Sequence, residues 1–250
     1  ARRKENLLPD GQVQETLGPV ARSAASYKKD ITCNLQKDNM KIKDVKVDFD
    51  FFVRTSSQEH KKIVSEILSS LYDNGLIIKK SYEGLYCEGC EQFKKKSDLD
   101  ENGLCPDHKV APKLITEENY FFRLEPYREW LKEYILSHPD WISPQKYAKE
   151  VLGMLDEPLD DLCISRPKER VWLGIELPFD SNFVTYIWFD ALINYISSLQ
   201  WGHNPNFNDL WGNSYHLLAK DILKPHCIYW PIMLKAIGIE PVTHCIVHGY

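Results

Sequence analysis

The sequence predicts an α/β fold in which a parallel sheet is combined with an inserted metal-binding module. In the C-terminal half, β-rich runs alternate with helical segments, an order that is typical of parallel α/β architecture. Between residues 81 and 118, apolar periodicity is weak, and cysteine and histidine recur at the spacing of metal ligands. We therefore expect ligand chemistry at the carboxyl ends of the parallel strands.

The composition is that of a globular protein with a modest acidic excess. The chain has 250 residues, which allows one large domain or two small ones. Its hydrophobic share of 43% excludes a disordered or fibrous chain. Lys and Arg together number 31 against 36 Asp and Glu, for a net charge of −5. This balance argues against a protein that binds nucleic acid along a continuous basic face, and it leaves room for a local contact.

The sequence also bears on the compartment. No stretch of about 18 uncharged apolar residues occurs, since the best candidate, 227–239, is interrupted by Lys235, and we expect no membrane span. The basic N-terminus is followed by Glu5 rather than an apolar block, unlike a secretory signal. Seven cysteines, an odd number, suit a reducing compartment. We expect the cytoplasm, with an organelle matrix as the alternative.

Three helices are expected in the first two thirds of the chain. From Glu59, apolar residues recur on one helical face, and Gly75 is a candidate C-cap; the face comprises Ile63, Val64, Ile67, Leu68 and Leu71. A second helix begins at Pro126 and stops at Pro139, with Tyr127, Trp130, Leu131 and Tyr134 on one face. A third begins with Ser143 as N-cap and Pro144 at the first position, and runs to about Leu155.

The strand–helix alternation predicts the remaining elements. Residues 183–189 form a β-rich run, after which Asp190 can cap a helix through Leu199. Residues 215–218 predict a short strand, 222–237 a helix closed by Gly238, and 243–247 another strand. Near the N-terminus, only 42–47 alternates like a strand.

Four residues have the spacing of a zinc knuckle. Cys87 and Cys90 form a Cys-x-x-Cys pair, and Cys105 and His108 form a Cys-x-x-His pair after fourteen intervening residues. Two such pairs supply the tetrahedral sulfur and nitrogen ligands that Zn²⁺ accepts, and four protein ligands leave no open position, so the site would be structural. A disulfide pair or coincidental buried thiols remain the alternatives. The nearby run Lys94–Lys96 is either a solvated loop or a phosphate contact.

Several aromatic and charged residues cluster near the expected strand ends. Trp188 and Tyr195 fall in and after the β-rich run, and His226 follows a charged stretch at a helix start. Taken singly, Trp188 and Tyr195 are more typical of core residues than of ligand contacts. By the same standard, a lone His226 is more typical of a satisfied structural histidine.

Taken together and in order, the motifs resemble those of a known family. They are Asp50–Thr55 with His60–Lys62, Tyr82–Cys87, Glu118–Leu124, Cys163–Pro167, Trp188–Tyr195 and Lys220–Pro231. In these residues the sequence is similar to the methionyl-tRNA synthetases, a family of class I aminoacyl-tRNA ligases, over roughly residues 48–250. Each motif alone would be weak, and their ordered combination is specific.

The resemblance implies a fold and a domain plan. The fold would be a split Rossmann-type α/β domain with a parallel sheet and an inserted connective module that carries the zinc knuckle. Residues 1–80 would be a remnant of the first half of the catalytic domain, and 81–124 the connective module. Residues 125–250 would then hold helices and the second half of the catalytic domain.

The resemblance also implies an activity. The family activates methionine with ATP, whose counter-ion is Mg²⁺, and transfers the methionyl group to the acceptor end of tRNA. Three alternatives remain open. They are a non-catalytic tRNA- or methionine-binding module from the same core, a ligase for a larger aliphatic amino acid, and an α/β zinc protein of another role. The trio Trp188, Tyr195 and His226 speaks against the aliphatic substrate. The sequence sets no oligomeric state.

Site residues follow position by position from the resemblance. The methionine side chain would be enclosed by Trp188, Ala191, Leu192, Tyr195 and His226, whose aromatic rings suit a polarizable thioether. ATP would contact Ala219, Asp221, His248 and Gly249. Arg166 and Lys220 would serve near the reacting groups.

The sequence also departs from the family pattern. It lacks the His-Ile-Gly-His motif, it ends before the Lys-Met-Ser-Lys-Ser loop, and Ala219 stands where the family usually has glycine. Electrostatic donors dominate such catalysis, and losing one typically lowers the rate about 10²–10³-fold. We therefore expect the 250-residue chain alone to be incomplete and weakly active.

Overall fold

The structure is a computed structural model that describes residues 54–249, apart from 88–91, 95, 97–98, 107, 172 and 186–187. The described residues fall into two compact units, one made of 83–117 and the other of 54–82 together with 118–249. The expected strand at 42–47 lies outside the described residues. The three-part domain plan, 1–80, 81–124 and 125–250, stays a prediction.

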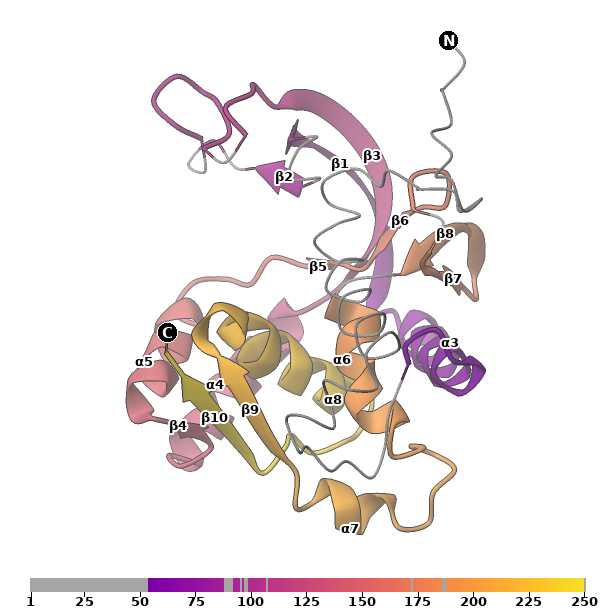
Figure 1. Cartoon of the computed structure of the whole chain (residues 1–250), viewed down its shortest axis with the longest axis vertical. Helices are drawn as coiled ribbons and strands as arrows, with labels where there is room; N and C mark the ends of the chain where they lie inside the picture. The colour runs from indigo at the N-terminus through magenta and orange to yellow at the C-terminus, as the bar shows by residue number, and fades with distance from the viewer. Residues whose placement is uncertain are drawn as a thin grey trace, which may run out of the picture. The chain divides into compact units, whose positions relative to one another are not determined.

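The larger unit contains a small parallel sheet, in which β9 and β10 lie side by side (Figure 1). Strand β10 (His244–His248) pairs in parallel with β9 (Tyr215–Ala219) on one side and with β4 (Ile142–Ser143) on the other. This confirms the strands expected at 215–218 and 243–247. Burial alternates along β9, with His216 and Leu218 inward and Leu217 75% exposed. One face of the sheet therefore packs on the core.

Two other sheets are not parallel in the pairs that the structure describes. Strand β8 (Asp180–Thr185) pairs antiparallel with β6 (Ser165–Pro167) and β7 (Ile175–Leu177). The alternation had predicted that the run 183–189 belongs to the parallel sheet. That prediction is wrong for residues 183–185, which pair antiparallel in β8. Only Pro178 and Phe179 separate β7 from β8, and so short a connection can join antiparallel strands alone.

The third sheet has the order β2-β1-β3-β5. Its strands are β1 (Ile77–Cys87), β2 (Gln92–Lys94), β3 (Lys113–Phe122) and β5 (Leu162–Cys163). Strands β1 and β3 each have one end in either unit. The segment 81–118, expected to be an inserted module with weak apolar periodicity, begins and ends in long strands.

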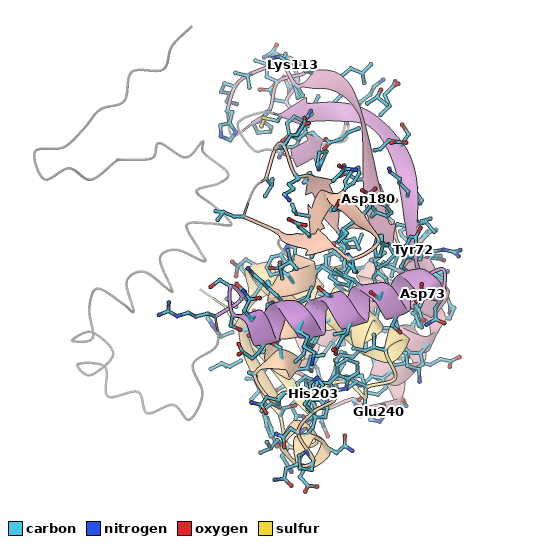
Figure 2. The ribbon with its side chains drawn as sticks, turned by 90° about the vertical axis from the view of Figure 1, so that its right-hand side faces the viewer. Tyr72, Asp73, Lys113, Asp180, His203 and Glu240 are labelled. Atoms are coloured by element: carbon cyan, nitrogen blue, oxygen red, sulfur yellow. The ribbon has the colours of Figure 1, made fainter. Side chains whose placement is uncertain are left out.

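Helix α3 (Gln58–Asp73) confirms the first expected helix. Its five predicted apolar residues are all buried, because they share the face that packs on the core. The helix begins at a Ser57 cap, whose hydroxyl accepts from the His60 N–H at 3.2 Å. Its C-terminal end carries Tyr72, which stacks on Phe179 at 4.0 Å between ring centroids, beside Asp180 (Figure 2).

The second and third expected helices are also present, with one corrected start. After a 3₁₀ turn, Glu125–Tyr127, helix α4 covers Arg128–Ser137. Helix α5 covers Gln145–Met154, and its N-cap is Pro144, with no side-chain cap bond. Ser143 was expected to be the cap, but its backbone is used in β4, where it pairs with Ile246 of β10.

Helix α6 (Trp188–Ser197) begins before the expected Asp190 cap. The strand ends at Thr185, so Trp188 and Phe189 are helical, and Asp190 lies within the first turn instead of capping it. A carboxylate in the first turn is still favourable, because it faces the positive end of the helix dipole. A short helix, α7 (Phe207–Trp211), follows before β9.

The helix expected at 222–237 is interrupted. A 3₁₀ turn η3 (Lys220–Ile222) leads into the π turn η4 (Pro225–Tyr229), and α8 (Trp230–Ala236) follows, with Gly238 at φ +77° beyond it. Pro231 has no N–H to donate to a preceding carbonyl, and a wider turn before it accommodates that loss. None of the helices described has the length and apolar character needed to span a membrane.

Replacing Leu68 with Ala should lower the free energy of unfolding by about 2–5 kcal/mol, because the side chain is 0% exposed in the core and leaves a cavity. Urea denaturation followed by circular dichroism measures the loss. The matched control is Leu136→Ala on α4, where the leucine is 65% exposed and the change should be within about 0.5 kcal/mol. Equal losses for the two variants would contradict the assigned core.

Candidate functional site

Four of the predicted site residues lie along one face of α6. Trp188, Ala191, Leu192 and Tyr195 have the spacing i, i+3, i+4 and i+7, which places side chains on the same side of a helix. Leu192 is buried in the hydrophobic core, whereas the other three are half-buried. The face thus offers an indole and a phenol beside a small residue.

His226 reaches the same place from the π turn. Its Nε2 lies 3.0 Å from the Tyr195 hydroxyl, and its ring is 6.2 Å from that of Trp188 in an edge-to-face arrangement at 79°. The structure therefore brings together Trp188, Tyr195 and His226. His226 lies 31 residues after Tyr195 in the sequence. Such π turns are frequent at functional sites.

The hydrogen bonds fix the protonation of this pair. The Ile222 carbonyl can only accept, so His226 Nδ1, at 2.9 Å, must donate to it. Burial lowers the pKa of His226, outweighing the bond to Ile222, which raises it. Burial also raises the pKa of Tyr195. Both groups are therefore neutral at physiological pH, and the Tyr195 hydroxyl donates to the bare Nε2 of His226.

The sequence reasoning missed one residue of this cluster. His216, on β9, is 6% exposed, and its ring lies 4.2 Å from that of Tyr195. The Trp230 indole N–H donates to its Nε2 at 3.1 Å. The available signal was a polar residue at an inward position of the expected strand 215–218.

The predicted nucleotide-contacting residues gather at the carboxyl ends of β9 and β10. Ala219 is the register partner of His248, so the two strands end side by side. Lys220 and Asp221 follow Ala219 directly in η3, and both are exposed. Gly249 follows His248, whose Nδ1 donates to the Gly249 carbonyl at 2.9 Å. Ala219 has φ −83° and ψ 154°, which any residue adopts, so its backbone does not require glycine.

Arg166 lies on a different sheet. It belongs to β6, and its Nη1 donates to the Cys163 sulfur at 2.8 Å and to the Ser165 carbonyl at 2.9 Å. The predicted catalytic residues Arg166 and Lys220 therefore come from separate strands, β6 and the end of β9.

Three of the four predicted metal ligands meet in the smaller unit. The ligand atoms of Cys87, Cys105 and His108 all lie within 4.8 Å of one another. Both cysteines are buried and not in a disulfide, and His108 is exposed, with Nδ1 3.9 Å from the Cys105 sulfur. This excludes a disulfide between Cys87 and Cys105. Cys90 lies outside the described residues.

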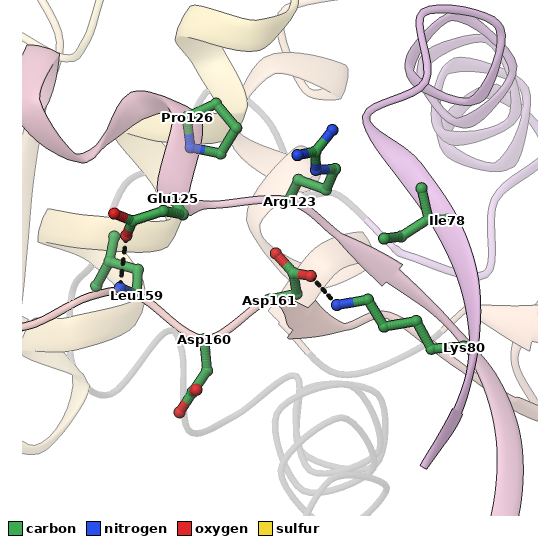
Figure 3. Close-up of a pocket in the computed structure, with 8 residues that line it drawn as sticks. All are labelled: Ile78, Lys80, Arg123, Glu125, Pro126, Leu159, Asp160 and Asp161. Atoms are coloured by element: carbon green, nitrogen blue, oxygen red, sulfur yellow. Dashed lines mark hydrogen bonds and ion pairs between the residues drawn. The ribbon is translucent and has the colours of Figure 1, made fainter.

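A separate open cavity of about 540 Å³ lies in the larger unit (Figure 3). Its charged groups are already engaged in part: Lys80 pairs with Asp161, and Glu125 accepts from the Leu159 N–H at 2.7 Å. None of the predicted site residues lines it. The lining comprises Ile78, Lys80, Arg123, Glu125, Pro126, Leu159, Asp160 and Asp161.

The family of tRNA synthetases class I (M) matches residues 21–113 and 108–250. The chain belongs to this family. The parallel sheet and its crossover are thus those of a class I tRNA synthetase, which agrees with the expected α/β fold.

Individual class I (M) relatives support the assignment. The chain is 43% identical over 213 residues to the methionine–tRNA ligase of Deinococcus radiodurans, covering 83% of this chain and 31% of that protein. It is 37% identical over 213 residues to a chloroplastic/mitochondrial methionine–tRNA ligase of Arabidopsis thaliana, covering 83% and 34%. The chain thus spans about a third of the length of these relatives.

Solved structures give the same family. The methionyl-tRNA synthetase of Mycobacterium tuberculosis bound by methionyl-adenylate superposes with a TM-score of 0.78 at 28% identity, covering 92% of this chain and 47% of that one. The apo form of the same enzyme gives 0.76 at 29% identity, covering 88% and 45%.

Acidification should destabilise the chain through His216. Burial and the neighbouring His226 lower the pKa of His216 from 6.5 to about 4. Between these pH values the unfolded chain binds a proton that the folded chain does not, so stability falls as the pH falls from 6.5 to 4, by about 3 kcal/mol for this group. Denaturant titrations across this range should show a smaller fall for His216→Gln. Parallel curves for both proteins would contradict the assigned burial.

Proposed function

We propose that the chain is part of a methionine–tRNA ligase core, which activates methionine with ATP and transfers it to the acceptor end of tRNA. The observation that carries this proposal is the meeting of Trp188, Tyr195 and His226 through a 3.0 Å hydrogen bond and edge-to-face rings. The names of the relatives support the choice of methionine. Methionine-dependent exchange of pyrophosphate into ATP would measure whether the 250-residue chain alone activates methionine.

The chemistry of the trio suits a thioether side chain. Aromatic edges make favourable contacts with a polarizable sulfur. The neutral state of His226 and Tyr195 suits an uncharged ligand, since a charged imidazole in this setting would demand a counter-charge. Ala191 leaves room beside the rings, and Leu192 supports the helix face from the core.

The strand ends supply the nucleotide half of the site. In this proposal Asp221 contacts the adenosine ribose, and Ala219, His248 and Gly249 flank the nucleotide, with Lys220 near the phosphates. Carboxyl ends of parallel strands are the usual ligand edge of such sheets. The methionine carboxylate would attack the α-phosphate of Mg²⁺-bound ATP, and pyrophosphate would leave. Arg166, held by Cys163 and Ser165, would present a fixed positive charge to the reacting groups.

We also propose that the smaller unit holds a structural Zn²⁺. Cys87, Cys105 and His108 fit the ion, because two sulfurs and one ring nitrogen lie within 4.8 Å of one another, and Cys90 would be the fourth ligand. Bound zinc would cross-link the ends of this unit. The proposed compartment is the cytoplasm or an organelle matrix, the latter in keeping with the Arabidopsis relative named chloroplastic/mitochondrial.

Methionine binding to the chain should be abolished or weakened at least tenfold by Trp188→Ala, because the substitution removes one aromatic wall of the pocket. Isothermal titration calorimetry of methionine, with and without ATP, measures this. Trp130→Ala is the matched control, since Trp130 lies on α4, where its ring contacts that of Tyr134 at 5.7 Å between centroids and not the trio. Methionine binding that survives Trp188→Ala unchanged would show that the pocket lies elsewhere.

Metal analysis of the purified chain should find about one zinc per chain. Cys105→Ser should lose it, because one of four ligands is removed and the remaining three hold the ion less tightly. Atomic absorption after dialysis gives the content. The control Cys163→Ser, in the larger unit, should keep its zinc. Full zinc content in the Cys105→Ser protein would rule out the proposed ligand set.

A further inference from the structure

His216 occupies a position that no part of the expected site includes. It lies in the middle of β9, opposite Cys245 of β10, and its side chain points into the core. The imidazole contacts Tyr195 at 4.2 Å between ring centroids and accepts from the Trp230 indole at 3.1 Å. Its ring also lies 5.9 Å from that of His226. It therefore touches the phenol from the side of the sheet.

The hydrogen bond to Trp230 determines which nitrogen of His216 carries the proton. An indole N–H can only donate, so the Nε2 of His216 is bare and Nδ1 is protonated. Adding a second proton at Nε2 would break the bond to Trp230. The imidazole thus acts as a neutral acceptor that ties β9 to the first residue of α8.

Tyr195 is held between these groups. Its ring has His216 on one side and Trp230 at 6.0 Å, and its hydroxyl donates to His226. A tyrosine ring turns about two side-chain bonds, so its direction depends on what packs against it. Removing the acceptor at 216 would leave the Trp230 N–H buried without a partner, and relaxation of the indole would shift the surface on which Tyr195 rests.

We propose that His216 is a positioning residue for the methionine pocket: it holds Trp230 and Tyr195 so that the Tyr195 hydroxyl is committed to His226. This rests on the proposed function for its consequence in binding. The Tyr195 hydroxyl hydrogen is used in the bond to His226, and the N–H of His226 is used in the bond to the Ile222 carbonyl, so neither residue donates to a ligand. A side chain that needs no hydrogen-bond donor, such as a thioether, therefore fits these two residues better than a side-chain amide does.

The first test reads the Tyr195–His226 bond directly, without ligand. In the chain labelled with ¹⁵N-histidine, the Nε2 resonance of His226 should have the shift of a bare, hydrogen-bonded nitrogen. His216→Phe, which keeps a ring but has no acceptor, should move that resonance. His216→Gln, which can accept from Trp230, should restore most of it. An unmoved resonance in the His216→Phe protein would overturn the proposal.

Two further variants keep this test sharp. Trp230→Phe removes the same hydrogen bond from the donor side, and it should move the His226 resonance in the same direction even if His216→Phe does not fold. Trp141→Phe is the control: its indole is 2% exposed and donates to the Val242 carbonyl at 2.8 Å, so it loses a buried indole bond elsewhere in the unit. A shift in the Trp141→Phe protein as large as that in His216→Phe would mean a general loss of structure and would overturn the proposal.

The second test measures the consequence for ligands. Calorimetry should show methionine bound about tenfold more weakly by His216→Phe, the fold-change expected of one misplaced hydrogen bond, with much of the loss recovered in His216→Gln. The ratio of the affinity for methionine to that for glutamine should also fall in the His216→Phe protein. An unchanged preference would overturn the role in selectivity. If the unsubstituted chain binds no methionine, the proposed function fails, and the ring-nitrogen measurement still decides the role of His216.

Discussion

The parallel pairing of β9 with β10 is the constraint on which the candidate site depends. Parallel neighbours cannot be joined by a tight turn, so the chain must leave β9 at its carboxyl end and cross over before it enters β10. That crossover places Lys220 and Asp221 at the strand ends and carries His226 over the buried face of the sheet. The same register sets Ala219 beside His248. One ladder of backbone hydrogen bonds therefore positions both the proposed nucleotide edge and the aromatic cluster of Trp188, Tyr195 and His226.

The aromatic cluster around Tyr195 contains polar side chains that carry no charge. Three hydrogen bonds connect it: Tyr195 donates to His226, His226 to Ile222, and Trp230 to His216. Such a connected network in a dry interior strengthens its own bonds and fixes the rings. Two histidines 5.9 Å apart remain uncharged because burial penalises the imidazolium form of each. A surface of this kind is rigid, aromatic and free of net charge.

Local patterns predicted local structure well. The apolar face of α3 and the strands β9 and β10 follow from residue spacing, because helical and extended periods differ within a few residues. The cluster of Cys87, Cys105 and His108 was also predictable, since its ligands are close in sequence. The prediction for the run 183–189 was wrong in where the strand ends and in how it pairs. The two-residue connection after Leu177 joins β7 to β8 and makes the pair antiparallel. His216 was missed because the alternation of a strand predicts which side chains point inward but not which distant residues they contact.

The π turn at Pro225–Tyr229 makes the length of this segment as important as its composition. A π turn contains about one residue more than an α-helical turn, and each residue rotates an α-helix by about 100°. Deleting one residue here would restore a regular helix and leave the 1% exposed Trp230 facing the core, but it would change the direction of His226 within the turn. Side chains in this turn should therefore tolerate replacement more readily than the backbone tolerates a gap or an insertion.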